Sequence, residues 1–259
     1  MDENQLLTFG GHLEVFRRML FRIIAVVAAI SIVLFCFKDT TWSILLAPSE
    51  WDFISYRSIE NFIQWIGFPS FHFEPYHVDL IATDLSSQFM THITTAIYLG
   101  MLGASPYILY ELFRFISPAL YDNERRYSVQ VAVIIYALFI IGVLMTYYLL
   151  FPISFRFLGT YSVSERVHST ITLDSYITTF TSLTLVMGLV FQLPVIAFFL
   201  SKLGFVESWM LTRYRRHAFL IIMFIAAIIT PPDIMTLILV TIPLYLLYEL
   251  SIRVVKLAE

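Results

Sequence analysis

The sequence predicts an all-α integral membrane protein: one polytopic domain over residues 1–259, with six transmembrane helices and both termini on the same side. Three observations predict this class. The chain is 59% hydrophobic and only 14% charged, whereas a soluble domain carries about 25% charged residues. Its mean hydropathy is +0.80. Six apolar segments recur along the chain, and most lysines and arginines fall on one side of them.

The first four apolar segments have the length of transmembrane helices, which need about 20 residues to cross a hydrocarbon core of roughly 30 Å. They cover residues 19–37, 89–110, 129–150 and 177–200. Arg22 lies in the first turn of the first segment, where its side chain can reach the interface. Gln192 and Pro194 lie inside the fourth.

The last two segments, residues 217–230 and 234–250, are shorter and are separated only by Pro231, Pro232 and Asp233. Two consecutive prolines cannot continue a helix, so these three residues are predicted to form a structural turn in a helical hairpin. A 14-residue helix is about 21 Å long. Two short crossings would therefore thin the bilayer locally or lie in a protein-lined recess; the alternative is a re-entrant pair.

The lysines and arginines set the orientation. Twelve lie on the side that holds both termini: Arg17, Arg18, Arg22, Arg114, Arg125, Arg126, Lys202, Arg213, Arg215, Arg216, Arg253 and Lys256. Four lie on the other side: Lys38, Arg57, Arg156 and Arg166. Because positive residues favour cytoplasmic loops, both termini are predicted to be cytoplasmic, with residues 1–18 as a cytoplasmic tail.

The predicted outer loop, residues 38–88, is the longest connection in the chain. Ile59, Phe62, Ile63 and Ile66 follow the spacing of one helical face, and Trp65 suits an interfacial depth. We expect interfacial helices that lie on the outer membrane surface. The alternative is a compact loop packed on the helix ends.

Catalytic motifs are absent from the sequence. It contains no GxSxG, HExxH, Walker or GxGxxG motif. The spacing of His72 and His77 with Glu74 and Asp79 matches no standard metal site. The single cysteine, Cys36, excludes an internal disulfide, and the net charge of −3 with no basic run gives no indication of nucleic acid binding. We therefore expect a binder or conduit, with no catalytic residue, no metal and no cofactor.

Polar groups at membrane depth are the remaining candidates for function. A buried amide without a partner costs a few kcal/mol, so Gln192 is expected to contact another helix, either of this chain or of a partner protein. The hydroxyl-rich run in the same segment favours close helix packing. Its members are Thr178, Thr179, Thr181, Ser182 and Thr184.

The predicted cytoplasmic loop, residues 111–127, mixes aromatic residues, Pro118 and charges of both signs. Glu124 stands next to Arg125 and Arg126, so it belongs either to a surface ion cluster or to a site that grips a guanidinium bidentately. The residues by themselves leave both interpretations open.

The run FRFISPALYDNERR, from Phe113 to Arg126, resembles the signature of the TatC family of the twin-arginine protein translocase. Other stretches resemble the family in the same order. They are HLEVFRR (12–18), IATDLSSQF (81–89), FPISFRFL (151–158), FQLPV (191–195) and TPPD (230–233). The resemblance covers essentially the whole chain, and the family has six spans with both ends inside.

The resemblance implies a receptor subunit for the export of folded proteins, located in the bacterial inner membrane. It implies that twin-arginine signal peptides bind at the cytoplasmic face, with Glu124, Phe115, Pro118, Glu14 and Arg17 as the contacting residues. It also implies single-span partners of the TatA and TatB type, other copies of the chain in one complex, and transport driven by the protonmotive force. Gln192 and Pro194 are then the expected contacts to a partner helix.

Two positions depart from the family pattern. Aligned on His12 and Arg17, the acid of the N-terminal motif is replaced by Val15, and Glu14 lies one residue earlier, a rotation of about 100° on a helix. Gln192 stands where the family commonly carries Glu, which removes a protonation switch. The alternative function is a small-solute secondary transporter, for which Pro194 and Pro243 give weak support.

Overall fold

The computed structural model describes residues 9–70, 72–116, 128–162, 164 and 170–259, most of them helical. Four helices are long and apolar enough to cross a membrane, or five if one bent pair is counted as a single span. The prediction of a helical membrane protein is confirmed; the count of six crossings remains a prediction consistent with these helices. The chain divides into two compact units, residues 1–38 with 92–136 and residues 39–91 with 137–259.

The first unit contains α1 (Phe9–Cys36), α5 (Ser105–Ile116), most of α4 (Ser87–Gly103) and the start of α6 (Ser128–Met145). Helix α1 begins ten residues before the expected apolar segment, because only the apolar part was visible as a span. Helices α4 and α5 form the bent pair, with an angle of 54° between them. Pro106 explains the bend, since it lacks an N–H and its ring crowds the preceding turn.

A glycine allows α1 and α4 to approach closely. A Cβ atom at Gly100 would lie 2.0 Å from the Ser31 hydroxyl oxygen of α1. The Ser31 hydroxyl donates to the Val27 carbonyl one turn earlier, at 2.8 Å. Helices with small residues at their crossing can bring their backbones together, and this contact fixes α4 against α1 in the first unit.

The central helices of the second unit are the end of α6, α7 (Phe151–Thr160), α8 (Leu173–Val190) and α9 (Leu193–Lys202). The third expected segment does not end at residue 150: a π-helical turn over Thr146–Leu150 leads directly into α7. Pro152 does not stop the chain, because it lies in the first turn of α7, where a missing N–H costs little. A short break separates α8 from α9 within the fourth expected segment.

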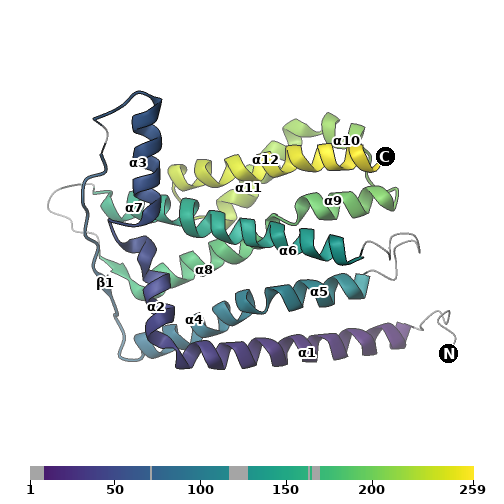
Figure 1. The fold of residues 1–259 in the computed structure, drawn as a ribbon, viewed down its shortest axis with the longest axis horizontal. Coiled ribbons are helices and arrows are strands. Elements are labelled where there is room, and N and C mark those ends of the chain that lie inside the picture. The colour runs from purple at the N-terminus through teal and green to yellow at the C-terminus, as the bar shows by residue number, and fades with distance from the viewer. Residues whose placement is uncertain (1–8, 71, 117–127, 163, 165–169) are drawn as a thin grey trace. The chain divides into compact units, whose positions relative to one another are not determined.

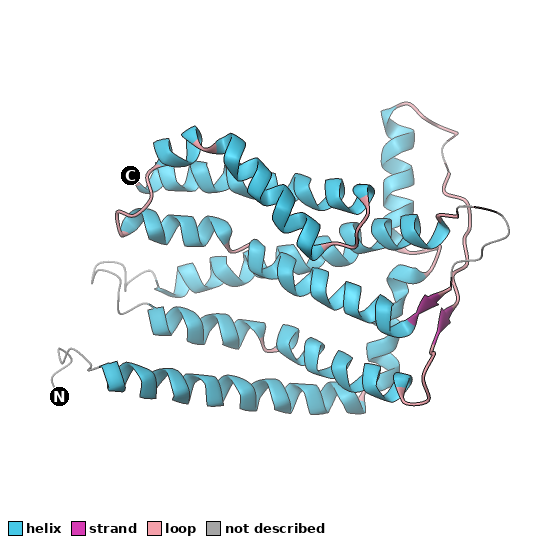
Figure 2. Ribbon diagram, turned by 180° about the vertical axis from the view of Figure 1, so that it is seen from behind, coloured by secondary structure: helices cyan, strands magenta, loops and turns pink. Residues whose placement is uncertain are grey.

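The C-terminal part of the second unit consists of α10 (Ser208–Arg213), α11 (Arg215–Ile229) and α12 (Ile234–Ala258). Helix α12 packs along α9 and α11 (Figure 2). Helix α11, with 15 residues, is short as expected. Helix α12 is not: it has 25 residues, continues past the expected end at residue 250 and runs through Pro243 without a break.

The first part of the predicted outer loop is helical, with α2 (Lys38–Leu46), a 3₁₀ turn (Ala47–Ser49) and α3 (Ile54–Ile66), whereas the stretch between α3 and α4 contains no helix among its described residues. Figure 1 shows α3 lying across the direction of α8 and α12. A short strand, β1 (Leu80–Ile81), pairs in parallel with β2 (Ile171–Thr172), with Leu80 opposite Ile171. Trp65 is 82% exposed and Phe62 59% exposed on α3, so both aromatic side chains are free to contact a membrane surface. The placement of α3 on that surface remains a prediction.

Candidate functional site

The predicted cytoplasmic end of the first unit carries Glu14 and Arg17 on α1. Both side chains are exposed. Glu14 forms an ion pair with Arg18, one turn further along the helix. Because an exposed pair at this spacing contributes only about 0.3–0.5 kcal/mol, the Glu14 carboxylate is readily available to another cation.

Phe115 lies in the last described turn of α5 and is 36% exposed. Its ring centroid is 5.7 Å from that of Phe16 on α1, with the planes tilted by 54°. The structure thus brings the predicted residue Phe115 beside the helix that carries Glu14 and Arg17. Pro118 and Glu124 lie outside the described residues.

One acidic residue at this end of the first unit is not among the residues predicted from the sequence. Glu111 of α5 is 4% exposed, and its Oε2 accepts a hydrogen bond from Arg22 Nη2 of α1 at 3.1 Å. Its Oε1 accepts from the Tyr107 hydroxyl at 3.0 Å. The only sequence signals were an acid at the end of an apolar run and an arginine inside another, 89 residues apart.

Gln192 and Pro194 both lie at the break between α8 and α9, and both are buried. The Gln192 side-chain amide donates to the Gly188 carbonyl one turn earlier, at 3.4 Å. Pro194 occupies the first turn of α9 and favours the restart of a helix at that point. The apolar neighbours Leu189, Leu193 and Ile196 are 60%, 39% and 49% exposed, so the surface next to the amide is apolar.

The hydroxyl-rich run of α8 turns its most buried members toward the interior of the second unit. Thr181 and Thr184 are 0% and 1% exposed. Each hydroxyl donates to a carbonyl one turn back, Ile177 and Phe180 respectively, at 2.7 Å. These residues satisfy their polar groups within their own helix and leave small surfaces for close packing.

Pro231, Pro232 and Asp233 connect α11 to α12. Helix α11 ends at Ile229 and the backbone becomes extended at Thr230. The carboxylate of Asp233 accepts from the Thr236 N–H at 2.6 Å, so it caps the N-terminus of α12. The turn is therefore closed by a proline pair on one side and a capping carboxylate on the other.

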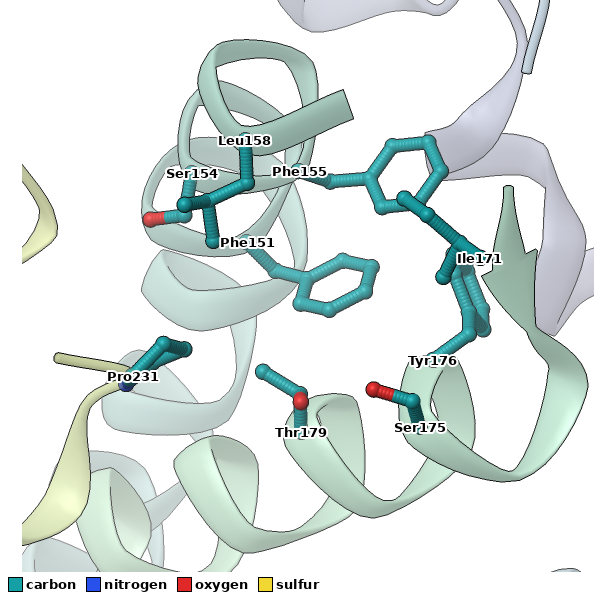
Figure 3. A pocket seen from close by; sticks show the side chains of 9 residues that line it. All are labelled: Phe151, Ser154, Phe155, Leu158, Ile171, Ser175, Tyr176, Thr179 and Pro231. Carbon is teal, nitrogen blue, oxygen red and sulfur yellow. The ribbon is translucent and has the colours of Figure 1, made fainter. Parts of the chain in front are cut away.

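A cavity of about 320 Å³ opens between α7, α8 and this turn. Figure 3 shows Phe151 and Phe155 of α7 and Tyr176 of α8 forming its aromatic side, with Pro231 opposite. The Tyr176 ring meets those of Phe151 and Phe155 edge-on, at 5.0 and 5.1 Å between centroids. The polar lining of the cavity consists of the hydroxyl residues Ser154, Ser175 and Thr179.

Arg156 organises the outer loop of the second unit. Its guanidinium carbon lies 4.5 Å from the ring centroid of Phe73, 4.7 Å from Tyr76 and 5.3 Å from Tyr56. The Tyr56 hydroxyl donates to the Pro152 carbonyl at 2.8 Å. Burial, followed by the hydrogen bond with Tyr76, raises the pKa of Tyr56 above its ordinary value, so this phenol is neutral.

The side chains of the candidate site indicate which ligand it could hold. Among the described residues, no three or more histidine, cysteine or acidic side chains are grouped as a metal site would require. The acidic and aromatic side chains at the predicted cytoplasmic end are instead suited to holding a guanidinium group by charge, hydrogen bonds and stacking.

Residues 11–243 match the family model described as Sec-independent protein translocase protein (TatC). A TatC protein of Blattabacterium sp. subsp. Periplaneta americana (strain BPLAN) is 34% identical over 256 residues, covering 98% of this chain and 96% of the relative. The TatCy protein of Bacillus subtilis (strain 168) is 36% identical over 185 residues, which are 71% of this chain and 73% of that protein.

A crystal structure described as the twin arginine translocase receptor TatC superposes with a TM-score of 0.74. It is 30% identical and the match covers 95% of this chain and 99% of that one. A second crystal structure of the receptor, in DDM, gives a TM-score of 0.73 at 29% identity. The likeness thus extends over nearly the full length of both chains.

Proposed function

Because the chain belongs to the TatC family of Sec-independent protein translocase proteins, we propose that it binds the twin-arginine signal peptides of folded cargo at the cytoplasmic face. As a TatC protein, it is a multi-pass membrane component of a protein translocase and not an enzyme. The family assignment also argues against the alternative of a small-solute transporter.

The observation that carries the proposal is the exposed aromatic end of α5. Phe115, beside Phe16, lies in the last described turn before the predicted loop that contains Pro118 and Glu124. A carboxylate holds a guanidinium by two charge-assisted hydrogen bonds, and an aromatic face stacks on its plane. A peptide with two consecutive arginines would use both interactions, with Glu124 as principal acceptor and Glu14 and Arg17 at the border of the site.

Partner recruitment belongs to the second unit in this proposal. A single-span helix of the TatA or TatB type would cover the exposed apolar residues Leu189, Leu193 and Ile196 and lie next to Gln192 and Pro194. The driving force for export would be the protonmotive force. Because a folded cargo cannot pass through one small helical subunit, recruited partners and further copies of this chain would supply the passage.

The proposed orientation places both termini in the cytoplasm of a bacterial cell, with the protein in its inner membrane. The excess of lysine and arginine at the ends of α1, α5 and α12 supports it. Signal peptides would then reach Phe115 and Glu124 before any crossing of the membrane.

An export assay tests the proposed function. Glu124→Ala should abolish export of a twin-arginine reporter while the protein stays in the membrane at its normal level. Glu124→Gln should fail nearly as badly because the amide keeps the shape and loses the charge, and Phe115→Ala should also be defective. Glu14→Ala is the milder comparison. Normal export by the Glu124→Ala variant would show that Glu124, with Arg125 and Arg126, belongs only to a surface ion cluster.

A further inference from the structure

The first unit contains a carboxylate that is held by an arginine of the chain itself. Glu111 is 4% exposed, and its two oxygens accept one hydrogen bond each, from Arg22 at 3.1 Å and from Tyr107 at 3.0 Å. Tyr107 lies one turn earlier on the same helix, so it fixes the carboxylate in place whatever cation occupies the other oxygen.

A carboxylate with this degree of burial is stabilised by a cation partner, because an unpaired buried charge costs several kcal/mol. Arg22 supplies that cation at present. Its own side chain is nevertheless 50% exposed and donates a single hydrogen bond to the acid. Arginine binds carboxylates best through two parallel hydrogen bonds. The single bond between Arg22 and Glu111 is therefore weaker than the bidentate pair that another arginine could form with Glu111.

The surroundings of Glu111 resemble a receptor site for an arginine. One turn further along α5 stands Phe115, whose ring meets Phe16 of α1. A guanidinium on Glu111 would therefore have an aromatic neighbour at the i+4 position, where stacking adds to the ion pair. Arg22 already shows that a guanidinium reaches the carboxylate from the exposed side of α1.

The second unit contains the same trio of residue types without this setting. Glu249 of α12 accepts from Arg215 of α11 at 2.9 Å and from Tyr245, one turn earlier, at 3.1 Å. Its side chain is 27% exposed. The residue one turn further along is Arg253, which repels an incoming arginine instead of stacking on it. The two trios thus provide a matched pair for experiment.

We propose that Glu111 is a further acceptor for one arginine of the signal peptide, and that Arg22 is its intramolecular stand-in until the peptide arrives. The inference rests on the proposed function and names the site of one of the two arginines. Peptide binding would exchange one arginine for another, so no buried charge is left unpaired during the exchange. Glu111 would also offset the loss of the family acid at Val15.

The exchange makes Arg22 a competitor of the peptide. If Arg22 occupies Glu111 for about nine-tenths of the time, it raises the apparent Kd of the peptide about tenfold. Removing Arg22 should therefore tighten binding, the opposite of what the loss of a merely structural ion pair would do.

The test measures the affinity of the full-length protein in detergent for a fluorescent signal peptide that carries Arg-Arg, and for its Lys-Lys counterpart. Arg22→Gln should bind the Arg-Arg peptide on the order of tenfold more tightly. Glu111→Gln, which keeps the shape and the contact with Tyr107, should bind it several-fold more weakly and discriminate less against Lys-Lys. The double variant should behave like Glu111→Gln, and the matched control Arg215→Gln should bind like the wild type.

Unchanged or weaker binding by Arg22→Gln would overturn the exchange, as would a double variant that keeps the gain. Arg22→Lys, which retains a cation and the fold, should fall between the wild type and Arg22→Gln; binding equal to the wild type would count against the proposal. A failure of this inference alone would leave the wild type selective for Arg-Arg and the Glu124→Ala variant defective. If the wild type itself binds the Arg-Arg and Lys-Lys peptides equally well, the proposed function is refuted as well.

Discussion

Arg156 shows how one residue holds the outer loop to the second unit. Its guanidinium contacts the rings of Tyr56, Phe73 and Tyr76, and its Nη2 donates to the Glu74 carbonyl at 2.7 Å. Cation–π contacts contribute about 0.5–2 kcal/mol each, depending on how far they are desolvated. The loop residues from α3 to β1 thus converge on a single side chain of α7.

Replacing Arg156 should loosen this loop. We expect Arg156→Met to lower the free energy of unfolding by about 1–3 kcal/mol, because the cation and its hydrogen bond to the Glu74 carbonyl are lost. Arg156→Lys keeps the charge and should cost less. Thermal unfolding of the purified protein in detergent gives both values, and limited proteolysis between residues 67 and 79 locates the effect. Equal stability of the methionine variant and the wild type would contradict this role.

Substitutions at Gln192 distinguish a role in internal packing from a contact with a partner helix. Gln192→Leu should keep signal-peptide binding and weaken crosslinking to a single-span partner, because the amide next to Leu193 and Ile196 is lost. Gln192→Glu should be tolerated, because the acid keeps nearly the same shape and a hydrogen-bonding group. Unchanged partner crosslinking in Gln192→Leu would show that this amide serves internal packing, including its hydrogen bond with Gly188.

At this scale the sequence indicates residue types and not partners. Glu14, Phe115 and Gln192 were found because a motif or an apolar setting marks them. The pair of Arg22 and Glu111 was not, since a separation of 89 residues leaves no periodic signal and Arg22 alone suggests a side chain that reaches the interface. The aromatic contacts of Arg156 were missed for the same reason.

Helix crossings in this protein depend on small residues. At Gly100 an added Cβ would lie 2.0 Å from the Ser31 hydroxyl oxygen and 3.1 Å from its Cα. At Gly103, one turn on, it would lie 3.2 Å from a methyl group of Ile30. The first site has the Ser31 backbone close behind the side chain, whereas the second meets a single methyl group that needs to move by only a few tenths of an ångström.

This difference predicts unequal effects of two matched substitutions. Gly100→Ala should lower the free energy of unfolding by about 1–3 kcal/mol, because α1 and α4 must separate. Gly103→Ala should be nearly neutral, since a small shift of the Ile30 methyl group relieves the contact and alanine favours a helix. Thermal unfolding of the two variants in detergent tests the pair. Equal stabilities would show that α1 and α4 do not rely on the close approach at Gly100.

The sequence predicts which elements exist better than it predicts where they bend or end. The turn residues Pro231, Pro232 and Asp233 were evident from two adjacent prolines. The pairing of β1 with β2 was not, because two residues in each strand carry no period. Helix α12 continues past its expected end at residue 250, since Arg253, Lys256, Leu257 and Ala258 are good helix formers and no glycine or proline follows.

The topology of the whole molecule is a prediction from charge. In a Cys36→Ser background, single cysteines at Asn123 and Thr212 should react only with reagent on the cytoplasmic side, and cysteines at Asn61 and Ser164 only with reagent outside. The uneven distribution of lysine and arginine is the reason. Labelling of intact cells with an impermeant maleimide is the measurement. Reaction of position 123 from outside would invert the predicted topology.

For the whole molecule, composition and charge predicted the class and a likeness of motifs predicted the family, which the family model confirmed. The division into two compact units was not foreseen. It follows from the order of contacts along the chain, since α1 packs on α5 while the loop between residues 39 and 91 joins the later helices. Such long-range pairing is set by side-chain fit, which hydropathy does not record.

Photo-crosslinking tests whether the cytoplasmic end of this protein is a receptor for paired arginines. A photoreactive amino acid at Phe16, beside Phe115, keeps Glu124 intact and reports contact with a radiolabelled signal peptide in native membranes. We expect a crosslink to the Arg-Arg peptide, a much weaker one to the Lys-Lys peptide, and loss of the crosslink when Glu124→Ala is added. Equal crosslinking of the two peptides, or an undiminished crosslink in the Glu124→Ala background, would contradict it.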